Sequence, residues 1–199
     1  MDFRRVVVDK LGIDVVTHDP VILLTCEETK QVVPIVVGIF EATSIAFALE
    51  GHELPRPIAH DLIKSIIVNL DADLLRVEIY SLENDTYYCN LIIRNKEGEE
   101  IEIDCRPSDA IALALRMHVD IYMAEELLDR ATSHTGGFTA SCETNPDGTG
   151  NQVIMRSHDN SEPSAPVDTA REMAVDDFLD NMDLGDINLD EDNPDKENE

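Results

Sequence analysis

The first 132 residues alternate between short runs of β-branched residues and stretches with helical spacing. Runs of this kind, when they are bounded by turn-forming residues, are typical of β-strands. They predict about seven strands, at residues 6–8, 13–16, 21–24, 32–37, 75–82, 86–93 and 100–104. Turns at residues 83–85 and 95–98 join the last three strands into an antiparallel meander.

Apolar residues at helical spacing predict helices between these strands. One stripe covers residues 42–49 and ends at Gly51, a natural C-terminal stop. A second helix is predicted over residues 57–70, because proline is tolerated in the first turn, and a third over residues 107–115. A short fourth helix is predicted over residues 124–131. We therefore expect an α+β fold, with an antiparallel-rich sheet of about seven strands and three to four helices.

The composition changes near residue 132, which divides the chain into a domain (1–132) and a tail (133–199). The tail has 17 acidic and 3 basic residues, and it is rich in turn formers. Such a segment cannot bury enough apolar surface to offset its chain entropy, so we predict a disordered acidic tail. Within it, residues 175–189 could form a short amphipathic segment that docks on a protein partner or on the domain. Alternating acidic and apolar residues are also common in ordinary soluble tails.

The acidity bears on the partners that the chain can have. The 199 residues carry a formal net charge of −27. Nonspecific affinity for nucleic acid comes mainly from Lys and Arg, so the charge argues against a general binder of polyanions. Any role with nucleic acid must therefore rest on a local site. The same acidity would also serve as a solubility adaptation to high salt.

Several classes of protein lack support in the sequence. No apolar run reaches the length of a membrane span, and the first residues do not resemble a signal peptide, so we expect a cytoplasmic protein with no membrane partner. The four cysteines form no Cys-x-x-Cys pair and are expected to be reduced structural thiols. The motifs of serine hydrolases, dinucleotide enzymes, Walker-type nucleotide binders and zinc proteases do not occur.

Two segments carry polar residues that packing alone does not explain. Glu41 lies at the entry of the first helix, where it could bind a metal or only complement the helix dipole. Arg56 lies between two prolines, which would hold it as a clamp for phosphate or carboxylate. His60 and Asp61 follow in the first turn of the second helix, where they could bind a metal, shuttle protons or only cap the helix.

A third segment places four polar residues where a strand passes into a helix. Asp104 and Arg106 are expected to share one face of the strand, and Ser108 and Asp109 follow at the start of the helix. Carboxylates beside an arginine suit a divalent cation and a phosphodiester. A buried Arg–Asp pair with Ser108 as the helix cap is the alternative.

The three segments read VPIVVGIFEA at 33–42, PRPIAHDL at 55–62 and RPSDAIALA at 106–114. With these motifs in this order, the chain resembles the bifunctional nuclease domain family over about residues 3 to 131. The resemblance implies an α+β domain that forms homo-oligomers and has nuclease activity on DNA and RNA, helped by divalent metal. Plant members also carry an interaction motif of the nucleotide-excision-repair type after the domain, where this chain has its acidic tail.

The first hypothesis is therefore a metal-dependent nuclease (DNase, RNase or both) that uses Mg²⁺ or Mn²⁺. Its predicted metal ligands are Glu41, Asp61, Asp104 and Asp109. His60 is the predicted proton carrier, and Arg56 and Arg106 are the predicted phosphate clamps. Ser108 completes the set of predicted catalytic residues, which also includes Asp61, Asp104 and Asp109.

A different class of function is also compatible with the sequence. The domain could be a non-catalytic, oligomeric binding or regulatory module whose acidic tail recruits a protein partner. The tail could alternatively mimic nucleic acid and restrain the site of its own domain.

Overall fold

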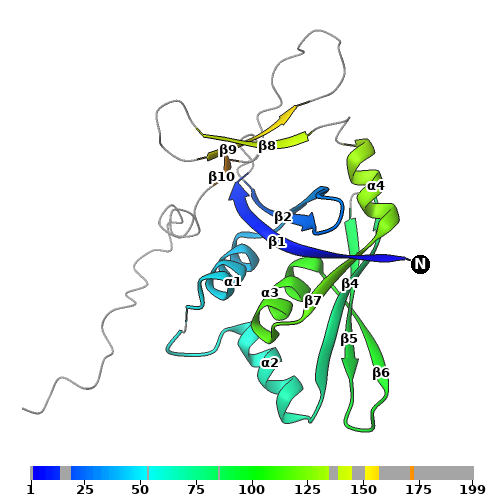
Figure 1. The fold of residues 1–199 in the computed structure, drawn as a ribbon. Helices are drawn as coiled ribbons and strands as arrows, with labels where there is room; N and C mark the ends of the chain where they lie inside the picture. The colour runs from blue at the N-terminus through cyan, green and yellow to red at the C-terminus, as the bar shows by residue number, and fades with distance from the viewer. Residues whose placement is uncertain are drawn as a thin grey trace, which may run out of the picture.

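The computed structural model describes residues 2–13, 19–52, 54–84, 86–134, 139–144, 151–156 and 171–172. Its main sheet has eight strands, seven of which lie side by side in the order β3-β2-β1-β7-β4-β5-β6 (Figure 1). They are β1 (Phe3–Ile13), β2 (Pro20–Cys26), β3 (Val32–Val36), β4 (Asp73–Glu83), β5 (Thr86–Arg94), β6 (Glu100–Cys105) and β7 (Asp120–Ala124). β4 and β7 pair in parallel, and every other pair of neighbours in this order is antiparallel.

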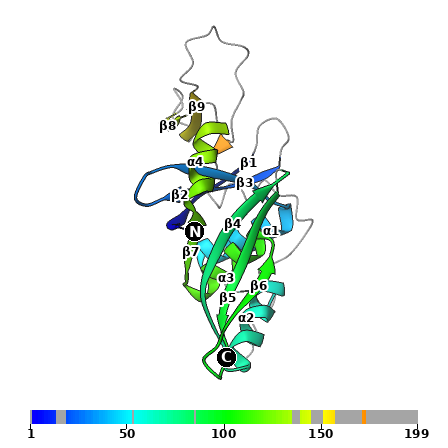
Figure 2. The same ribbon diagram turned by 90° about the vertical axis from the view of Figure 1, so that its right-hand side faces the viewer.

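Four helices accompany the sheet. They are α1 (Ile39–Glu50), α2 (Ala59–Asn69), α3 (Pro107–Met117) and α4 (Glu125–His134). The first three lie together on one side of the sheet, with α3 in contact with both α1 and α2 (Figure 1). After a rotation of 90°, β4, β5 and β6 lie in front of these helices (Figure 2). The α+β fold with an antiparallel-rich sheet is confirmed.

The core lies between the sheet and these helices, and it explains the apolar runs of the sequence. In β2, Ile22 and Leu24 belong to the main core, whereas Val21 and Leu23 pack with Val32 in a second cluster. Alternate residues of a strand point to opposite faces, so both faces of β2 are covered. A strand that is covered on both sides reads as one continuous apolar run, as residues 21–24 do.

The ends of the helices follow the local sequence closely. Gly51 adopts φ 67°, a left-handed conformation that favours glycine, and its N–H donates to the carbonyl of Phe47, which ends α1 as predicted. The second helix begins at Ala59 rather than at residue 57, with Ile58 as its N-cap residue. Pro57 therefore precedes the helix instead of opening it.

Two strands differ from the prediction. The runs at 6–8 and 13–16 were predicted as separate strands, but β1 continues from Phe3 to Ile13, and residues 14–18 lie outside the described residues. Strand β7 was not predicted. It is short and directly precedes α4, and it is held between β1 and β4 by pairing to both.

In the tail, the structure describes three short strands. β8 (Thr139–Thr144) and β9 (Asn151–Arg156) pair with each other, and β10 (Arg171–Glu172) pairs with the end of β1. The predicted disorder of 133–199 is not confirmed and stays a prediction. The predicted amphipathic segment 175–189 lies outside the described residues. In the part of the chain that is described, no helix is long and apolar enough to cross a membrane.

Candidate active site

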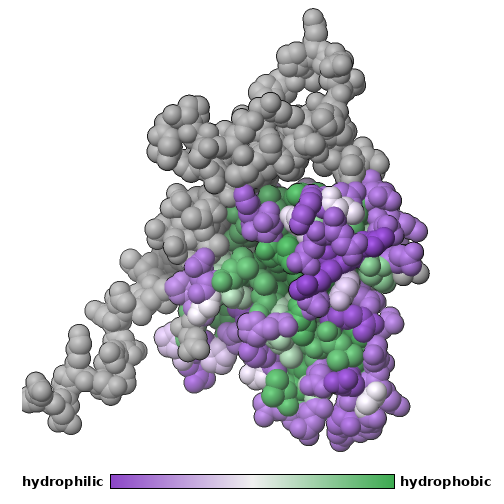
Figure 3. Space-filling view, in the orientation of Figure 1, coloured by the Kyte–Doolittle hydropathy of each residue, from purple (hydrophilic) through white to green (hydrophobic). Residues whose placement is uncertain are grey.

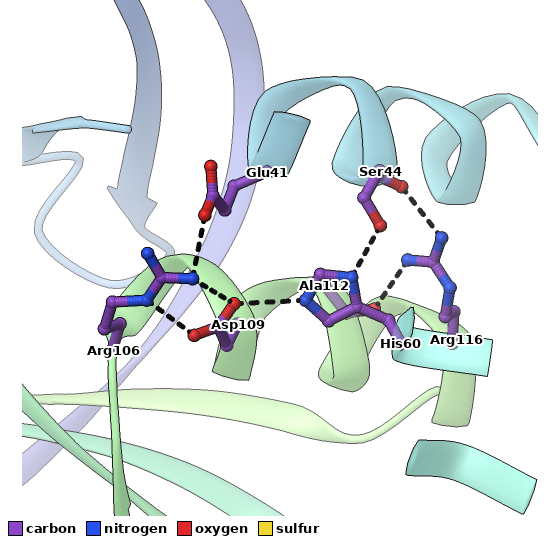
Figure 4. Close-up of polar contacts among 7 residues, drawn as sticks. All are labelled: Glu41, Ser44, His60, Arg106, Asp109, Ala112 and Arg116. Atoms are coloured by element: carbon purple, nitrogen blue, oxygen red, sulfur yellow. Dashed lines mark hydrogen bonds and ion pairs between the residues drawn. The ribbon is translucent and has the colours of Figure 1, made fainter. Parts of the chain in front are cut away.

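The N-terminal halves of α1, α2 and α3 bring polar side chains into contact, most of them from the three sequence segments (Figure 4). Helix α1 contributes Glu41 and Ser44, α2 contributes His60, and α3 contributes Asp109, with Arg106 as its N-cap residue. We call these five residues the polar cluster. Hydrogen bonds and ion pairs join them into one continuous chain.

His60 lies at the buried end of the polar cluster, with 8% of its surface exposed. Its Nδ1 lies 2.8 Å from Ser44 Oγ, and its Nε2 lies 3.2 Å from Asp109 Oδ1. An ionised carboxylate only accepts hydrogen bonds, so Nε2 carries a hydrogen, and the neutral ring accepts the Ser44 hydroxyl at Nδ1. Both ring nitrogens therefore have partners, which fixes the orientation of the imidazole.

Arg106 lies at the exposed end of the polar cluster. Its Nε and Nη2 donate to the two carboxylate oxygens of Asp109 at 2.8 and 3.0 Å, and Nη2 also lies 2.8 Å from Glu41 Oε1. Among the described residues no partner contacts Nη1, and the side chain is 66% exposed (Figure 4). The guanidinium is thus held by two carboxylates while two of its N–H groups stay open to solvent.

Gly38 makes room for the carboxylate of Glu41. It is the N-cap residue of α1, with φ −71°, a conformation that other residues also adopt. A Cβ atom at this position would collide with the Glu41 carboxylate. The glycine therefore allows the Glu41 carboxylate its present position, and a larger residue would displace the end of that side chain.

An ion pair with a buried arginine stands next to the polar cluster. Arg116, in the last turn of α3, has only 8% of its side chain exposed, and its Nε donates to Asp61 Oδ1 at 2.7 Å. Its Nη1 and Nη2 donate to the carbonyls of Ala112 and Ser44, both at 3.0 Å (Figure 4). Because these partners belong to three helices, Arg116 ties α1, α2 and α3 together beside His60.

The electrostatics favour the ionised state of both aspartates. Burial opposes ionisation of Asp109, but the hydrogen bonds from Arg106 and His60 and the charge of Arg106 outweigh it, so the pKa of Asp109 is below its ordinary value. In the same way, hydrogen bonds from Arg116 and from the Ile58 N–H hold the pKa of Asp61 below its ordinary value despite burial. The hydrogen bond and charge of Asp109, with those of Glu41, raise the pKa of Arg106.

The other predicted residues lie outside the polar cluster. Asp61 pairs with Arg116 and also accepts the Ile58 N–H at 3.1 Å, so it caps α2, one of the roles considered for it. Arg56 is exposed before α2 and forms no ion pair with the described residues. Ser108 is buried, with 7% exposure, and it does not cap α3.

Asp104 is not brought to the polar cluster, because of the alternation of strand β6. Cys105 packs against the core, so Asp104, one residue earlier, points to the outer face, where it pairs in register with Asn90. Arg106 follows the end of the strand and turns toward α1 and α3 instead. The expectation that Asp104 and Arg106 share one face is therefore wrong.

Sequence reasoning missed Ser44 and Arg116. Ser44 is a polar residue between the apolar Ala42 and Ile45 in the stripe of α1, which could have marked it as a buried hydrogen-bonding group. Arg116 lies seven residues after Asp109, which is two helical turns on the same face. That spacing could have indicated that the two side chains serve neighbouring contacts.

Comparison with known proteins gives the family of the chain. A family model described as the bifunctional nuclease domain matches residues 21–135, which include the whole polar cluster. The chain belongs to the bifunctional nuclease domain family.

Relatives in this family differ in length, and only some of them are named as nucleases. The chain is 40% identical over 114 residues to "Uncharacterized protein Rv1829" of Mycobacterium tuberculosis, a match that covers 57% of this chain and 67% of that protein. It is 28% identical over 110 residues to "Bifunctional nuclease 1" of Oryza sativa subsp. indica, and 24% identical over 113 residues to "Bifunctional nuclease 2" of Arabidopsis thaliana. The last two matches cover 54% and 55% of this chain but only 33% and 34% of the plant proteins.

The carboxylates predicted as metal ligands do not form a ligand set as they stand. Mg²⁺ and Mn²⁺ require several oxygen ligands around one point. Glu41 and Asp109 are both engaged by an arginine, Asp61 is engaged by a second arginine, and Asp104 lies on the outer face. Among the described residues, no group of three or more His, Cys, Asp or Glu side chains could hold a metal ion. Use of Mg²⁺ or Mn²⁺ stays a prediction.

Proposed function

We propose that this member of the bifunctional nuclease domain family cleaves phosphodiester bonds of DNA, RNA or both at the polar cluster. One observation carries the proposal. The exposed guanidinium of Arg106 is connected through Asp109 to the buried imidazole of His60. A cation at the surface and a proton-carrying group behind it are two elements that phosphodiester cleavage requires.

Arg106 has the geometry for contact with a phosphate. Its Nη1 amino group can donate to a phosphate oxygen while Nε and Nη2 keep their carboxylate partners. The same residue is the N-cap of α3, where the dipole of the helix also favours an anion. A bound phosphate would therefore meet a cation whose position is already fixed.

His60 can carry a proton without losing its partners. The neutral ring donates from Nε2 to Asp109 and accepts from Ser44 at Nδ1. When Nδ1 gains a proton, it donates to Ser44 Oγ instead, because a hydroxyl can serve in both directions. The role of Ser44 and Asp109 is then to position His60.

The net charge of the polar cluster gives a reason why cleavage would need a further cation. Two carboxylates, Glu41 and Asp109, face one guanidinium, so the polar cluster is net negative when His60 is neutral. A phosphodiester adds another negative charge. Protonated His60 or a divalent ion supplied with the substrate would offset it. A Mg²⁺ or Mn²⁺ ion would then have to arrive with the substrate, because the described residues offer no ligand set of their own.

The test is cleavage of labelled single-stranded and duplex DNA and RNA by the full chain, with Mg²⁺, with Mn²⁺ and with chelator. Arg106→Gln and His60→Asn should lower the rate at least tenfold, while their melting curves show that they fold. Asp104→Asn is the matched control for Asp109→Asn, since it removes the same charge five residues away on the outer face. Equal rates for all four variants and the unmodified chain would place the activity elsewhere.

The second candidate function is a non-catalytic oligomeric module, and an exposed face of α2 favours self-association. Leu62, Ile63 and Ile66 lie on the side of α2 away from the core, with 54%, 37% and 49% exposure. Leu70 continues the stripe with 66% exposure. Apolar surface is visible in this region in Figure 3. We propose that a second copy of the chain covers this α2 stripe.

Self-pairing fits the α2 stripe better than it fits the open edge of the sheet. The stripe is apolar, so a two-fold axis would pack it against the same apolar stripe of the second copy. Along the edge strand β6, by contrast, Glu100, Glu102 and Asp104 are exposed, and edge-to-edge pairing would crowd these carboxylates. The acidic edge therefore discourages extension of the sheet.

The mass of the protein in solution tests this assembly. Leu62→Glu should convert an oligomer into a monomer in light scattering without changing the circular dichroism spectrum. Thr86→Glu, which adds the same charge at an exposed position of β5, is the control and should leave the mass unchanged. A monomeric unmodified chain, or an oligomer that Leu62→Glu does not disturb, would contradict the α2 interface. An oligomer without cleavage of any substrate would favour the binding module, whose acidic tail would then be tested for a protein partner.

A further inference from the structure

Two cysteines face each other beside the polar cluster. Cys89 of β5 and Cys105, the last residue of β6, are direct partners in the antiparallel ladder. Both are free thiols that belong to or pack against the main core. The Cys89 Sγ lies 3.9 Å from the carbonyl oxygen of Asn90. The Cys105 Sγ also lies 3.7 Å from the carbonyl oxygen of Cys89.

This placement meets the geometric requirement for a disulfide. Directly paired residues of an antiparallel ladder have Cα atoms about 4.5 or 5.5 Å apart, depending on the type of pair. Both separations fall within the range of about 4.4 to 6.8 Å found for disulfides. Since paired residues also project to the same face, the two Cβ atoms lie on the same side of the sheet.

We propose that Cys89 and Cys105 form a reversible disulfide, which makes them a redox-sensitive site next to Arg106. The oxidant is a low-molecular-weight disulfide. Cys105 is half-buried and Cys89 is fully buried, so the oxidant meets Cys105 first.

The reaction balances as two successive exchanges. The Cys105 thiolate attacks one sulfur of the small disulfide, whose S–S bond breaks and releases one thiolate. Cys89 then gives up its proton as its sulfur attacks Sγ of Cys105, and the second thiolate is released. The protein loses two electrons and two protons, and the small disulfide gains them as two thiols.

The bond would act on the polar cluster because Arg106 directly follows Cys105. Closing the bond fixes the two sulfur atoms about 2.05 Å apart and restricts the side chain and backbone of Cys105 to disulfide geometry. Arg106 is the next residue, and its contacts of 2.8 to 3.0 Å to Glu41 and Asp109 depend on how the end of β6 is oriented. We therefore expect the oxidised form to be the less active one, a consequence that rests on the proposed function.

The first experiment measures the bond itself. The folded full chain is equilibrated in buffers of oxidised and reduced glutathione, the free thiols are blocked, and the peptides are mapped by mass spectrometry. A Cys89–Cys105 peptide that forms with oxidant and disappears with reductant is expected. Cys26→Ala, which removes a buried thiol outside the pair, should still give this peptide, and Cys105→Ala should not.

Two results would overturn the disulfide. One is the absence of the linked peptide at every glutathione ratio, and the other is its appearance only after denaturant unfolds the chain. These results need no nuclease activity, so they separate this inference from the proposed function.

The second experiment compares cleavage rates of the two forms. The oxidised chain should cleave at least tenfold more slowly than the reduced chain, with recovery on reduction, whereas Cys105→Ala should respond less than twofold. Equal rates for the two forms of the unmodified chain would refute the regulation while leaving the bond established. No cleavage by either form would refute the proposed nuclease, and the linked peptide would still decide the disulfide.

Discussion

Replacement of Arg116 by methionine should destabilise the domain more than replacement of any surface arginine. The side chain is 8% exposed and donates three hydrogen bonds, to Asp61, to the Ala112 carbonyl and to the Ser44 carbonyl. Methionine keeps much of the volume but none of the donors. Arg116→Met therefore removes one donor from the Ser44 carbonyl of α1 and the ion-pair partner from Asp61 of α2.

The three lost hydrogen bonds of Arg116 set the size of the loss in unfolding free energy. A hydrogen bond between charged partners contributes about 1.5 to 3 kcal/mol and one to a neutral carbonyl about 1 kcal/mol. Asp61 is 36% exposed and keeps the Ile58 N–H, so water and the helix cap recover part of the loss. We expect a net destabilisation of about 3 kcal/mol. For a domain of this size that corresponds to a fall of about 10 °C in Tm.

Thermal and urea unfolding followed by circular dichroism would measure this loss. Arg94→Met is the control, because Arg94 and its partner Asp73 are 48% and 66% exposed, and an exposed pair contributes about 0.5 kcal/mol. Adding Asp61→Asn to Arg116→Met should cost less than the two single losses together, since the two side chains interact. If Arg116→Met unfolds within about 0.5 kcal/mol of Arg94→Met, the role assigned to this buried arginine is wrong.

Three further predictions test the polar cluster and the ends of its helices. The pKa of Asp109 is lowered in the folded state, so the ionised carboxylate stabilises the fold fully at neutral pH, and this stabilisation is lost as pH falls below about 4. In urea unfolding, Asp109→Asn should therefore cost about 1 kcal/mol at pH 7 and much less at pH 3. Gly51→Ala should cost about 1 kcal/mol in the same assay, because φ is 67° there, and an unchanged midpoint would contradict it. Gly38→Ala should push the Glu41 carboxylate away from Arg106 with little loss of stability, and an unchanged cleavage rate would show that this carboxylate is dispensable.

Local sequence signals were sufficient where one element is determined by its own residues. The stripe of α1 and its stop at Gly51, and the hairpin turn that contains Gly98 at φ 88°, could be predicted because glycine at such angles is a local property. Strand β7 could not be predicted in this way. Its five residues become a strand because β1 and β4 offer backbone partners on both sides, and neither partner is near in sequence.

The polar cluster could be predicted in part for the same reason. His60, Arg106, Asp109 and Glu41 stand at helix starts, which turn signals reveal, and the packing of the helices then brings these starts together. Which carboxylate faces which cation depends on that packing. Asp61 was grouped with the candidate metal ligands, yet it faces Arg116, which lies 55 residues later in the chain.

The acidity of the chain and a nucleic-acid site are compatible because of how Arg106 is held. In an acidic domain, a flexible arginine would be drawn to whichever carboxylate lies nearest. Here Glu41 and Asp109 accept the hydrogen bonds of Nε and Nη2 of Arg106, and these bonds fix the orientation of the guanidinium, which leaves Nη1 open to solvent. A fixed donor loses little conformational entropy when it binds a phosphate oxygen, whereas the surrounding negative charge weakens adsorption of nucleic acid everywhere else. Glu41 and Asp109 lower the net charge of the polar cluster, and the same two carboxylates hold Arg106 in the orientation that makes it specific for a phosphate.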